Sequence, residues 1–219
     1  MKLFHSLIYP LLGGLLCLSC SDDEQDAGTK QPAITGEVTF GVDLTGFSTR
    51  VTQDGSSWNN GDKIGAYVLD MKTLEPATEA ANVPYVCSEE GASVSFASTA
   101  PLKVQSDEIP VKFVAYYPYN ADIRNFNYPV QLATQERGST ACDLLYAATN
   151  TYAPENEPHI ALNFSHRLAK VILKFVDLEK NPLEVSDVRV EGMQTEASFN
   201  VQTDVLTVDE SSVATITPY

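Results

Sequence analysis

The chain has few of the residue types on which catalysis and metal binding depend. Its 219 residues include only three histidines, four cysteines and one tryptophan. Motifs for a serine nucleophile elbow, a zinc protease, a phosphate-binding loop and a dinucleotide-binding turn are absent from the sequence. Since no nucleophile, base and orienting group occur at useful spacing, the sequence predicts no enzyme, no cofactor and no metal site.

Basic residues are also scarce. The sequence has 14 lysines and arginines against 29 aspartates and glutamates, which gives a net charge of −15. Binding to nucleic acid requires a basic surface, so this class of partner is excluded. The same charge argues against adhesion to anionic lipid, and it favours the solubility of an exposed surface protein.

Long apolar runs are missing. The longest lies around residues 7–18, shorter than the ~20 residues of a membrane-spanning helix. A lysine at position 2 precedes this run, and the small residue Ser19 stands directly before Cys20. This order is typical of a secretory signal over residues 1–19. It resembles a bacterial lipobox, in which Cys20 carries lipid, such as palmitate, and begins the mature protein; the alternative is an ordinary cleaved signal with an incidental cysteine.

An acidic run follows the leader. Residues 20–33 contain Asp22, Asp23 and Glu24 and show no apolar periodicity, which predicts a flexible tether. A solvated acidic tether is one interpretation of this run. The run also resembles the surface-export tag of lipoproteins in some Gram-negative anaerobes, which implies a surface-exposed lipoprotein of the outer membrane.

Beyond Cys17 in the leader and Cys20 directly after it, only Cys87 and Cys142 remain. In an oxidising envelope the two can form one disulfide. Two buried free thiols are the alternative, because free cysteine packs as a small apolar side chain. Neither residue has a cysteine or histidine at metal-binding spacing, so no zinc site is expected.

The body of the chain, residues 34–219, has the pattern of an all-β protein. Val38, Phe40, Val42 and Leu44 alternate with more polar or small residues, as in a strand with one apolar face. Similar segments recur at short intervals, at residues 64–69, 94–96, 111–117, 159–164, 168–176, 185–190, 197–201, 205–208 and 213–217. The sequence predicts a β-sandwich of about seven or more mostly antiparallel strands and no long amphipathic helix.

Two groups of side chains have competing interpretations. Trp58 and the aromatic cluster at residues 116–119 can stack on sugars, or they can pack in the core. His166 follows Phe164 by two residues, and we interpret it as a structural hydrogen-bonding group, because no nucleophile signature lies near it.

Four stretches, taken together, resemble the fimbrillin family, the Mfa-like subunits of type V pili. They are TR at 49–50 followed by SW at 57–58 and GDKIG at 61–65; AYYPY at 115–119; DLLYA at 143–147; and LNFSHRLAKV at 162–171. The similarity covers roughly residues 34–208. It implies a transthyretin-like β-sandwich that is exported as a lipoprotein.

The resemblance also implies a mechanism of assembly. In such proteins an arginine-specific protease removes the first strand, and the exposed groove accepts a strand from a neighbouring subunit. On this chain the removable strand would hold Val38, Phe40, Val42 and Leu44, and the cut would follow Arg50. The alternative is that Arg50 is an ordinary surface arginine.

We therefore expect a non-enzymatic, structural or adhesive pilus component. The alternative is a non-polymerising outer-membrane lipoprotein that binds glycan or host protein. Family members also have a second domain and a C-terminal donor strand. Residues 34–219 match only an N-terminal domain, so we expect an accessory or terminal subunit, a truncated product or a stand-alone surface protein.

Overall fold

The two longest strands are buried on both faces. They are β3 (Lys63–Asp70) and β7 (Val111–Tyr117) of the computed structural model. The structure describes residues 36–43, 57–79, 81–104, 110–135, 142–149 and 159–218. The apolar residues of the two strands form nearly continuous runs, as expected for strands covered by other elements on both sides. They pair with each other in an antiparallel ladder. All described residues belong to one compact unit, residues 32–219.

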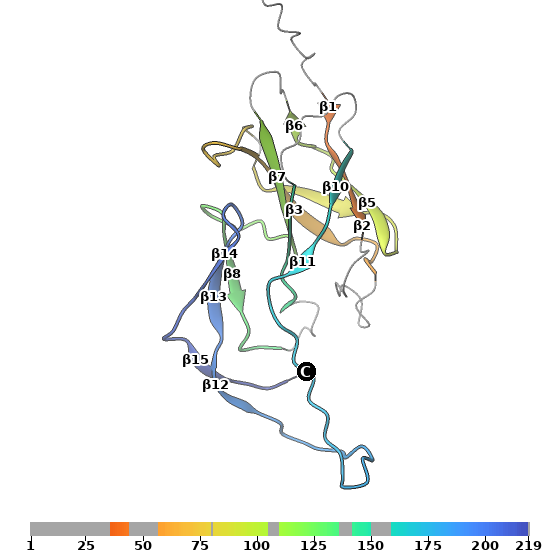
Figure 1. Ribbon diagram of the computed structural model, residues 1–219, viewed down its shortest axis with the longest axis vertical. Helices are drawn as coiled ribbons and strands as arrows, with labels where there is room; N and C mark the ends of the chain where they lie inside the picture. The colour runs from red at the N-terminus through yellow and green to blue at the C-terminus, as the bar shows by residue number, and fades with distance from the viewer. Residues whose placement is uncertain are drawn as a thin grey trace, which may run out of the picture. The chain divides into compact units, whose positions relative to one another are not determined.

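An eight-stranded sheet forms around this pair, in the order β10-β2-β5-β4-β3-β7-β9-β11 (Figure 1). The other members are β2 (Thr39–Asp43), β4 (Val83–Cys87), β5 (Ser93–Ala97), β9 (Leu145–Ala148), β10 (His159–Leu162) and β11 (Ser165–His166). Every neighbouring pair is antiparallel except β10 and β2, which run parallel. The first described strand of this sheet therefore lies in its interior rather than at an edge.

One face of the sheet encloses the main core. Strands β4 and β5 alternate buried and exposed residues, so each of them contributes one face to it. The ring of Phe40 on β2 packs edge-on against Tyr85 at 4.7 Å and against Phe113 at 6.0 Å. Residues distant in the sheet order thus meet in one core, because the sheet curls around these side chains.

A second layer covers the other face of β3 and β7. It is a three-stranded antiparallel sheet of β8 (Asn127–Gln131), β13 (Glu196–Asn200) and β14 (Val205–Val208). Phe199 and Val201 of this layer pack with Tyr67, Val114 and Tyr146 of the main sheet. The predicted all-β sandwich of mostly antiparallel strands is confirmed.

Two short sheets complete the described strands. They are β1 (Gly36–Glu37) with β6 (Lys103–Val104), and β12 (Val190–Gln194) with β15 (Val213–Ile216). The residues that the structure describes form no α-helix. They therefore include no helix that is long and apolar enough to cross a membrane.

Most predicted strands are present, but two predictions are wrong. Residues 168–176 and 185–189 contain no strand; they flank a turn at which Val176 bridges Pro182. Strand β12 begins at Val190, where the second predicted segment ends. The β-branched composition favours an extended backbone, but a strand also needs a ladder partner, and no described segment supplies one here. Strands β4, β8 and β9 were not predicted, and Pro84 and Pro129 interrupt the alternation in two of them.

Candidate functional site

Strand β2 is paired along both of its edges. On one side it runs parallel to β10, with Phe40 opposite Ile160. On the other side it runs antiparallel to β5, with Phe40 opposite Phe96. The backbone N–H of Val38 also donates to the carbonyl of Leu102 at 3.0 Å. Withdrawal of β2 would therefore leave two rows of backbone donors and acceptors unpaired.

The inward side chains of β2, and that of Val38 directly before it, are among the most buried of the described residues. Val38 and Phe40 are 0% exposed and Val42 is 2% exposed. These are three of the four side chains assigned to the removable strand; Leu44 lies outside the described residues. Because Phe40 fills a space between Tyr85 and Phe113, the strand contributes packing as well as backbone pairing.

The outward face of β2 has a steric restriction that sequence reasoning missed. Thr39 Oγ1 and His159 Nδ1 are 3.2 Å apart, and this places the imidazole over Gly41. A Cβ atom at position 41 would overlap the imidazole. The signal for this contact was the glycine itself, since glycine inside a strand often marks a close approach by another group.

The first two family stretches meet around Trp58. This side chain is 0% exposed and packs edge-on against Phe96, Tyr117 and Phe164 at 5.1–5.4 Å. Tyr116 is also fully buried. The interpretation of these aromatic residues as core is confirmed for Trp58 and Tyr116, because neither can reach a sugar in solution.

The GDKIG stretch forms the turn that leads into β3. Gly61 has a φ of +92°, and its N–H donates to the carbonyl of Cys87 at 2.8 Å. Asp62 accepts bonds from the Asn59 N–H at 2.7 Å and the Tyr117 hydroxyl at 3.3 Å. Burial raises the pKa of the Asp62 carboxyl, and these two bonds act against that increase. The turn is thus fixed by polar contacts to strands on both sides.

The third and fourth stretches pair with each other through β9 and β11. His166 Nδ1 lies 2.5 Å from Asp143 Oδ1, so His166 has the hydrogen-bond partner that its structural interpretation requires. Arg167 forms a bidentate pair with Asp204, at 2.6 and 2.8 Å, and its guanidinium lies 4.9 Å from the ring centre of Tyr146. These contacts tie the edge of the main sheet to the turn between β13 and β14.

The two remaining cysteines are free thiols in the structure. Cys87 is buried and donates to the carbonyl of Glu89 at 2.9 Å, whereas Cys142 is half-buried near the carbonyl of Thr134. Burial raises the pKa of both thiols, which makes them weak nucleophiles. Cys20 and Arg50 lie outside the described residues.

Metal-binding and nucleophilic chemistry find little support in the described part of the chain. No group of three or more histidine, cysteine, aspartate or glutamate side chains there could hold a metal ion. The hydroxyl of Ser165, next to the Asp143–His166 pair, bonds to the carbonyl of Tyr146 and to Arg167. Strand β2 in its two-sided slot is therefore the strongest candidate site.

Known proteins resemble this chain over most of its length. A protein of Bacteroides uniformis named "Putative fimbrium subunit Fim1C" is 29% identical over 209 residues, which are 91% of this chain and 65% of the relative. The chain thus spans less than two thirds of that relative's length.

Two crystal structures share the fold. One, from Bacteroides uniformis, has a TM-score of 0.61 and 23% identity over 84% of this chain and 69% of its own. The other, from Bacteroides ovatus, has a TM-score of 0.54 and 19% identity over 84% of this chain and 71% of its own. Each is named a "putative cell adhesion protein".

The profile of one protein family matches residues 49–219, which include most of the described strands and all four family stretches. The chain therefore belongs to the fimbrillin-like family.

Proposed function

We propose that this protein is a non-enzymatic pilus subunit that assembles by strand replacement. The observation that carries the proposal is the interior position of β2, paired on one side with β10 and on the other with β5. Removal of β2 would open a slot with unpaired backbone on two sides and an apolar floor. An extended strand from a neighbouring subunit would satisfy both at once.

The route to removal begins at the N-terminus. We propose that Cys20 is lipidated, that residues 21–33 tether the protein to the outer membrane, and that the body faces outward. A cut after Arg50 would release the lipid, the tether and β2 as one fragment. The family membership of the chain and the name of the Fim1C relative support a pilus role, and the motifs around Cys20 and Arg50 motivate this route.

The slot defines which strand it accepts. A replacement strand needs apolar side chains at the places of Val38, Phe40 and Val42, because all three are buried. A small residue is favoured at the place of Gly41, because a larger one would displace the exposed imidazole of His159 that lies over that position. This alternation specifies the register of the incoming strand.

The first test is cleavage of the full chain in membranes by an arginine-specific protease. We expect one early cut after Arg50, release of the body from the membrane fraction and retention of its fold. Arg50→Gln should prevent the release. The matched control Arg137→Gln removes an arginine elsewhere in the chain and should leave the release unchanged.

The second step uses the released body and a peptide of residues 36–44, GEVTFGVDL, as a probe of the slot. We expect the peptide to bind, and a Phe40→Asp peptide to bind about 10- to 100-fold more weakly, because burial of a phenylalanine contributes about 1.5–3 kcal/mol. Equal binding of the two peptides, or release of the body without any peptide binding, would refute strand replacement and favour a non-polymerising surface lipoprotein.

A further inference from the structure

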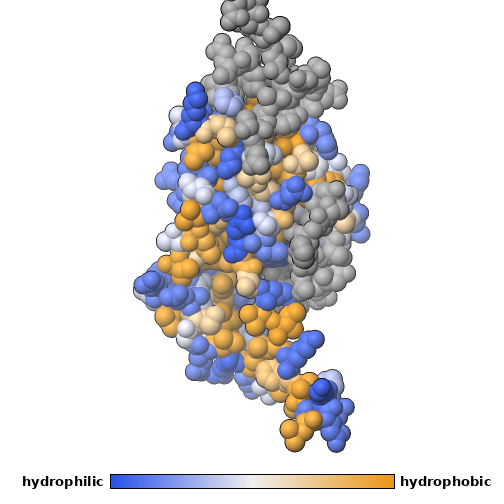
Figure 2. Space-filling view, in the orientation of Figure 1, coloured by the Kyte–Doolittle hydropathy of each residue, from blue (hydrophilic) through white to orange (hydrophobic). Residues whose placement is uncertain are grey.

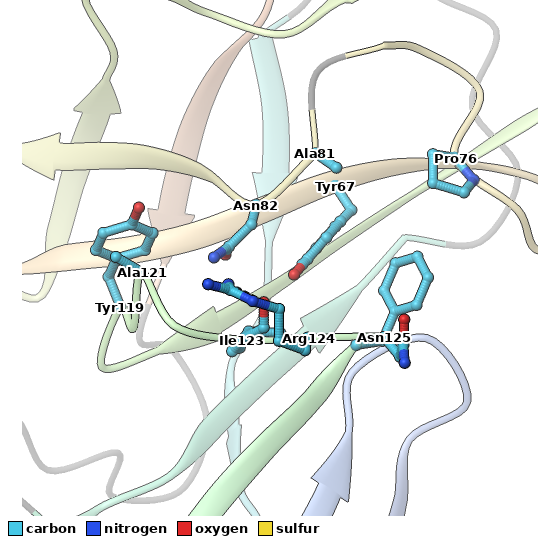
Figure 3. A pocket seen from close by; sticks show the side chains of 10 residues that line it. Tyr67, Pro76, Ala81, Asn82, Tyr119, Ala121, Ile123, Arg124 and Asn125 are labelled. Atoms are coloured by element: carbon cyan, nitrogen blue, oxygen red, sulfur yellow. Dashed lines mark hydrogen bonds between the residues drawn. The ribbon is translucent and has the colours of Figure 1, made fainter.

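A cavity of about 460 Å³ opens beside β3, which is separated from β2 by β5 and β4 in the sheet order. It lies between β3, the loop that precedes β4 and the loop that connects β7 to β8 (Figure 3). Its volume is within the range of about 300–1,000 Å³ that is typical of small-molecule sites. The residues that matter to its chemistry are Tyr67, Asn82, Tyr119, Arg124, Asn125 and Phe126.

Arg124 gives the cavity a positive charge. Figure 3 shows its side chain passing the hydroxyl end of Tyr67 and ending next to Asn82. One guanidinium N–H donates to the carbonyl of Ile123 at 3.0 Å. In the part of the chain that the structure describes, the ion pairs join His166 to Asp143 and Arg167 to Asp204, so Arg124 has no carboxylate partner there. The residues that line the cavity include no acid, although the chain carries a net charge of −15.

Aromatic side chains form the walls. The rings of Tyr67 and Phe126 pack against each other with centres 4.9 Å apart, and Tyr119 is partly exposed at the other side. Burial is the main cause that raises the pKa of Tyr67 to about 12, so its hydroxyl remains a neutral hydrogen-bond donor. Flat aromatic walls with hydroxyl and amide groups at their rims suit a ring that is apolar on its faces and polar at its edge.

The backbone around the cavity is held in an uncommon conformation. Asn125 and Phe126 have φ values of +51° and +62°, and they are the central residues of a turn closed by the Asn127 N–H on the Arg124 carbonyl at 3.0 Å. Positive φ is costly for phenylalanine. The Val201 N–H fixes the turn by donating to the Phe126 carbonyl at 2.9 Å. Strained backbone of this kind is concentrated at functional sites.

Asn82, with a φ of +52°, holds the opposite wall. Its amide accepts a bond from the Tyr116 hydroxyl at 2.7 Å and donates to the carbonyl of Asn120 at 2.9 Å. These contacts connect the cavity to the buried strand β7. Hydrogen bonds therefore hold the loops that line the cavity in place.

From this arrangement we propose that the cavity binds a sugar that carries a single carboxylate, with Arg124 pairing the carboxylate and Tyr119 and Phe126 stacking on the sugar ring. One guanidinium balances one negative charge. The strongly negative field of the chain opposes ligands of high negative charge, such as sulfated polymers or phosphates. The proposal does not depend on strand replacement, because none of these residues belongs to β2 or to its neighbours β5 and β10.

The test is calorimetric titration of the uncut full chain, in detergent, with glucuronate. Glucose serves as the neutral sugar and acetate as the carboxylate without a sugar. A sialylated oligosaccharide separates a terminal acidic sugar of a glycan from a free uronic acid. We expect glucuronate or the sialylated oligosaccharide to bind, and glucose and acetate to bind at least ~10-fold more weakly, since a charge-assisted hydrogen bond accounts for about that factor.

Matched variants locate the binding. Arg124→Gln should weaken acidic-sugar binding about 10- to 100-fold. Arg189→Gln removes an exposed arginine from another segment and should leave binding unchanged. Tyr119→Ala should also weaken binding without a change in the circular dichroism spectrum.

Two results would overturn the assignment. One is the absence of binding by both acidic sugars to a folded chain. The other is equal loss of binding in Arg124→Gln and Arg189→Gln. Either result leaves strand replacement untouched, because that mechanism is measured on the cut chain with a peptide.

Discussion

At the scale of single residues, Gly65 shows why the family stretch GDKIG ends in glycine. Gly65 lies on β3 opposite Tyr116 on β7, and the tyrosine ring covers the glycine backbone. A Cβ atom at position 65 would overlap the ring. The ring cannot move aside, because Tyr116 is fully buried and its hydroxyl is bonded to Asn82 and Asn120.

We predict that Gly65→Ala lowers the free energy of unfolding by about 1–3 kcal/mol, the usual cost of overpacking. Urea denaturation followed by tyrosine and tryptophan fluorescence measures the change. In the background of Tyr116→Ala, which removes the ring, the same substitution should cost much less. Equal costs in the two backgrounds would show that the steric contact with Tyr116 does not explain the glycine.

At the scale of elements, residues 171–176 and 183–189 are extended segments without a ladder, and we refer to them as the open arms. Their apolar side chains face solvent; Val171 is 77% exposed and Ile172 is 58% exposed. In Figure 2, apolar side chains gather on the surface of this C-terminal part of the chain. An apolar face of this kind marks an interaction surface or a region prone to aggregation.

We predict that the backbone amides of the open arms exchange with solvent at nearly the rate of an unstructured peptide, except that of Leu183, which donates to the carbonyl of Phe175 at 2.9 Å. Amides of β3 and β7 should exchange orders of magnitude more slowly, because both strands are paired and buried. Hydrogen exchange with mass spectrometry of the full chain measures both rates. Strand β13, which is paired on both sides, is the internal control within the same third of the chain.

Protection of the open arms in a dilute, monomeric sample would contradict this expectation. Protection that appears only as the protein concentration rises would instead show that a second copy of the chain binds the open arms.

The open arms also show where sequence reasoning at this scale succeeds and fails. Alternation correctly predicted β2 and β5, because it reports which face of a strand is buried. It also predicted β7, although both faces of that strand are buried. It failed at residues 168–176, because composition reports the preference for an extended backbone but not the presence of a partner. It also missed β8, in which Pro129 interrupts the pattern.

The candidate sites were predictable to different degrees. The apolar face of β2 was readable from the alternation of Val38, Phe40 and Val42. The restriction by His159 on Gly41 and the convergence of Tyr67, Arg124 and Phe126 depend on contacts between distant segments, which no local pattern contains. The cut after Arg50, the lipid on Cys20, and the division into residues 1–19, 20–33 and 34–219 stay predictions.

At the scale of the whole molecule, buried tyrosines couple folding to alkaline pH. Burial raises the pKa of Tyr85, Tyr128 and Tyr146 to about 12, from a usual value of 10. The folded state therefore keeps these groups neutral over a range in which the unfolded chain ionises. This contribution to stability is complete below pH 10 and is lost as the pH rises from 10 towards 12.

We predict that the free energy of unfolding is steady from neutral pH up to about pH 9.5 and then falls steeply, because unfolding releases tyrosines that ionise near pH 10. Urea midpoints across this range measure the fall. The ultraviolet absorbance of tyrosinate should show most buried tyrosines titrating near pH 12 in the folded chain and near pH 10 in urea. A single transition near pH 10 in the folded chain would contradict the burial of these hydroxyls.

The position of β2 between β10 and β5 also has a mechanical consequence. A strand at the edge of a sheet can be peeled from one end, so its hydrogen bonds break one after another. A strand held on both sides and pulled along its own axis loads the bonds of both ladders in shear, and they must break together. If a neighbour's strand fills this slot, each joint between subunits resists tension along the fibre far better than it resists bending or twisting at its ends.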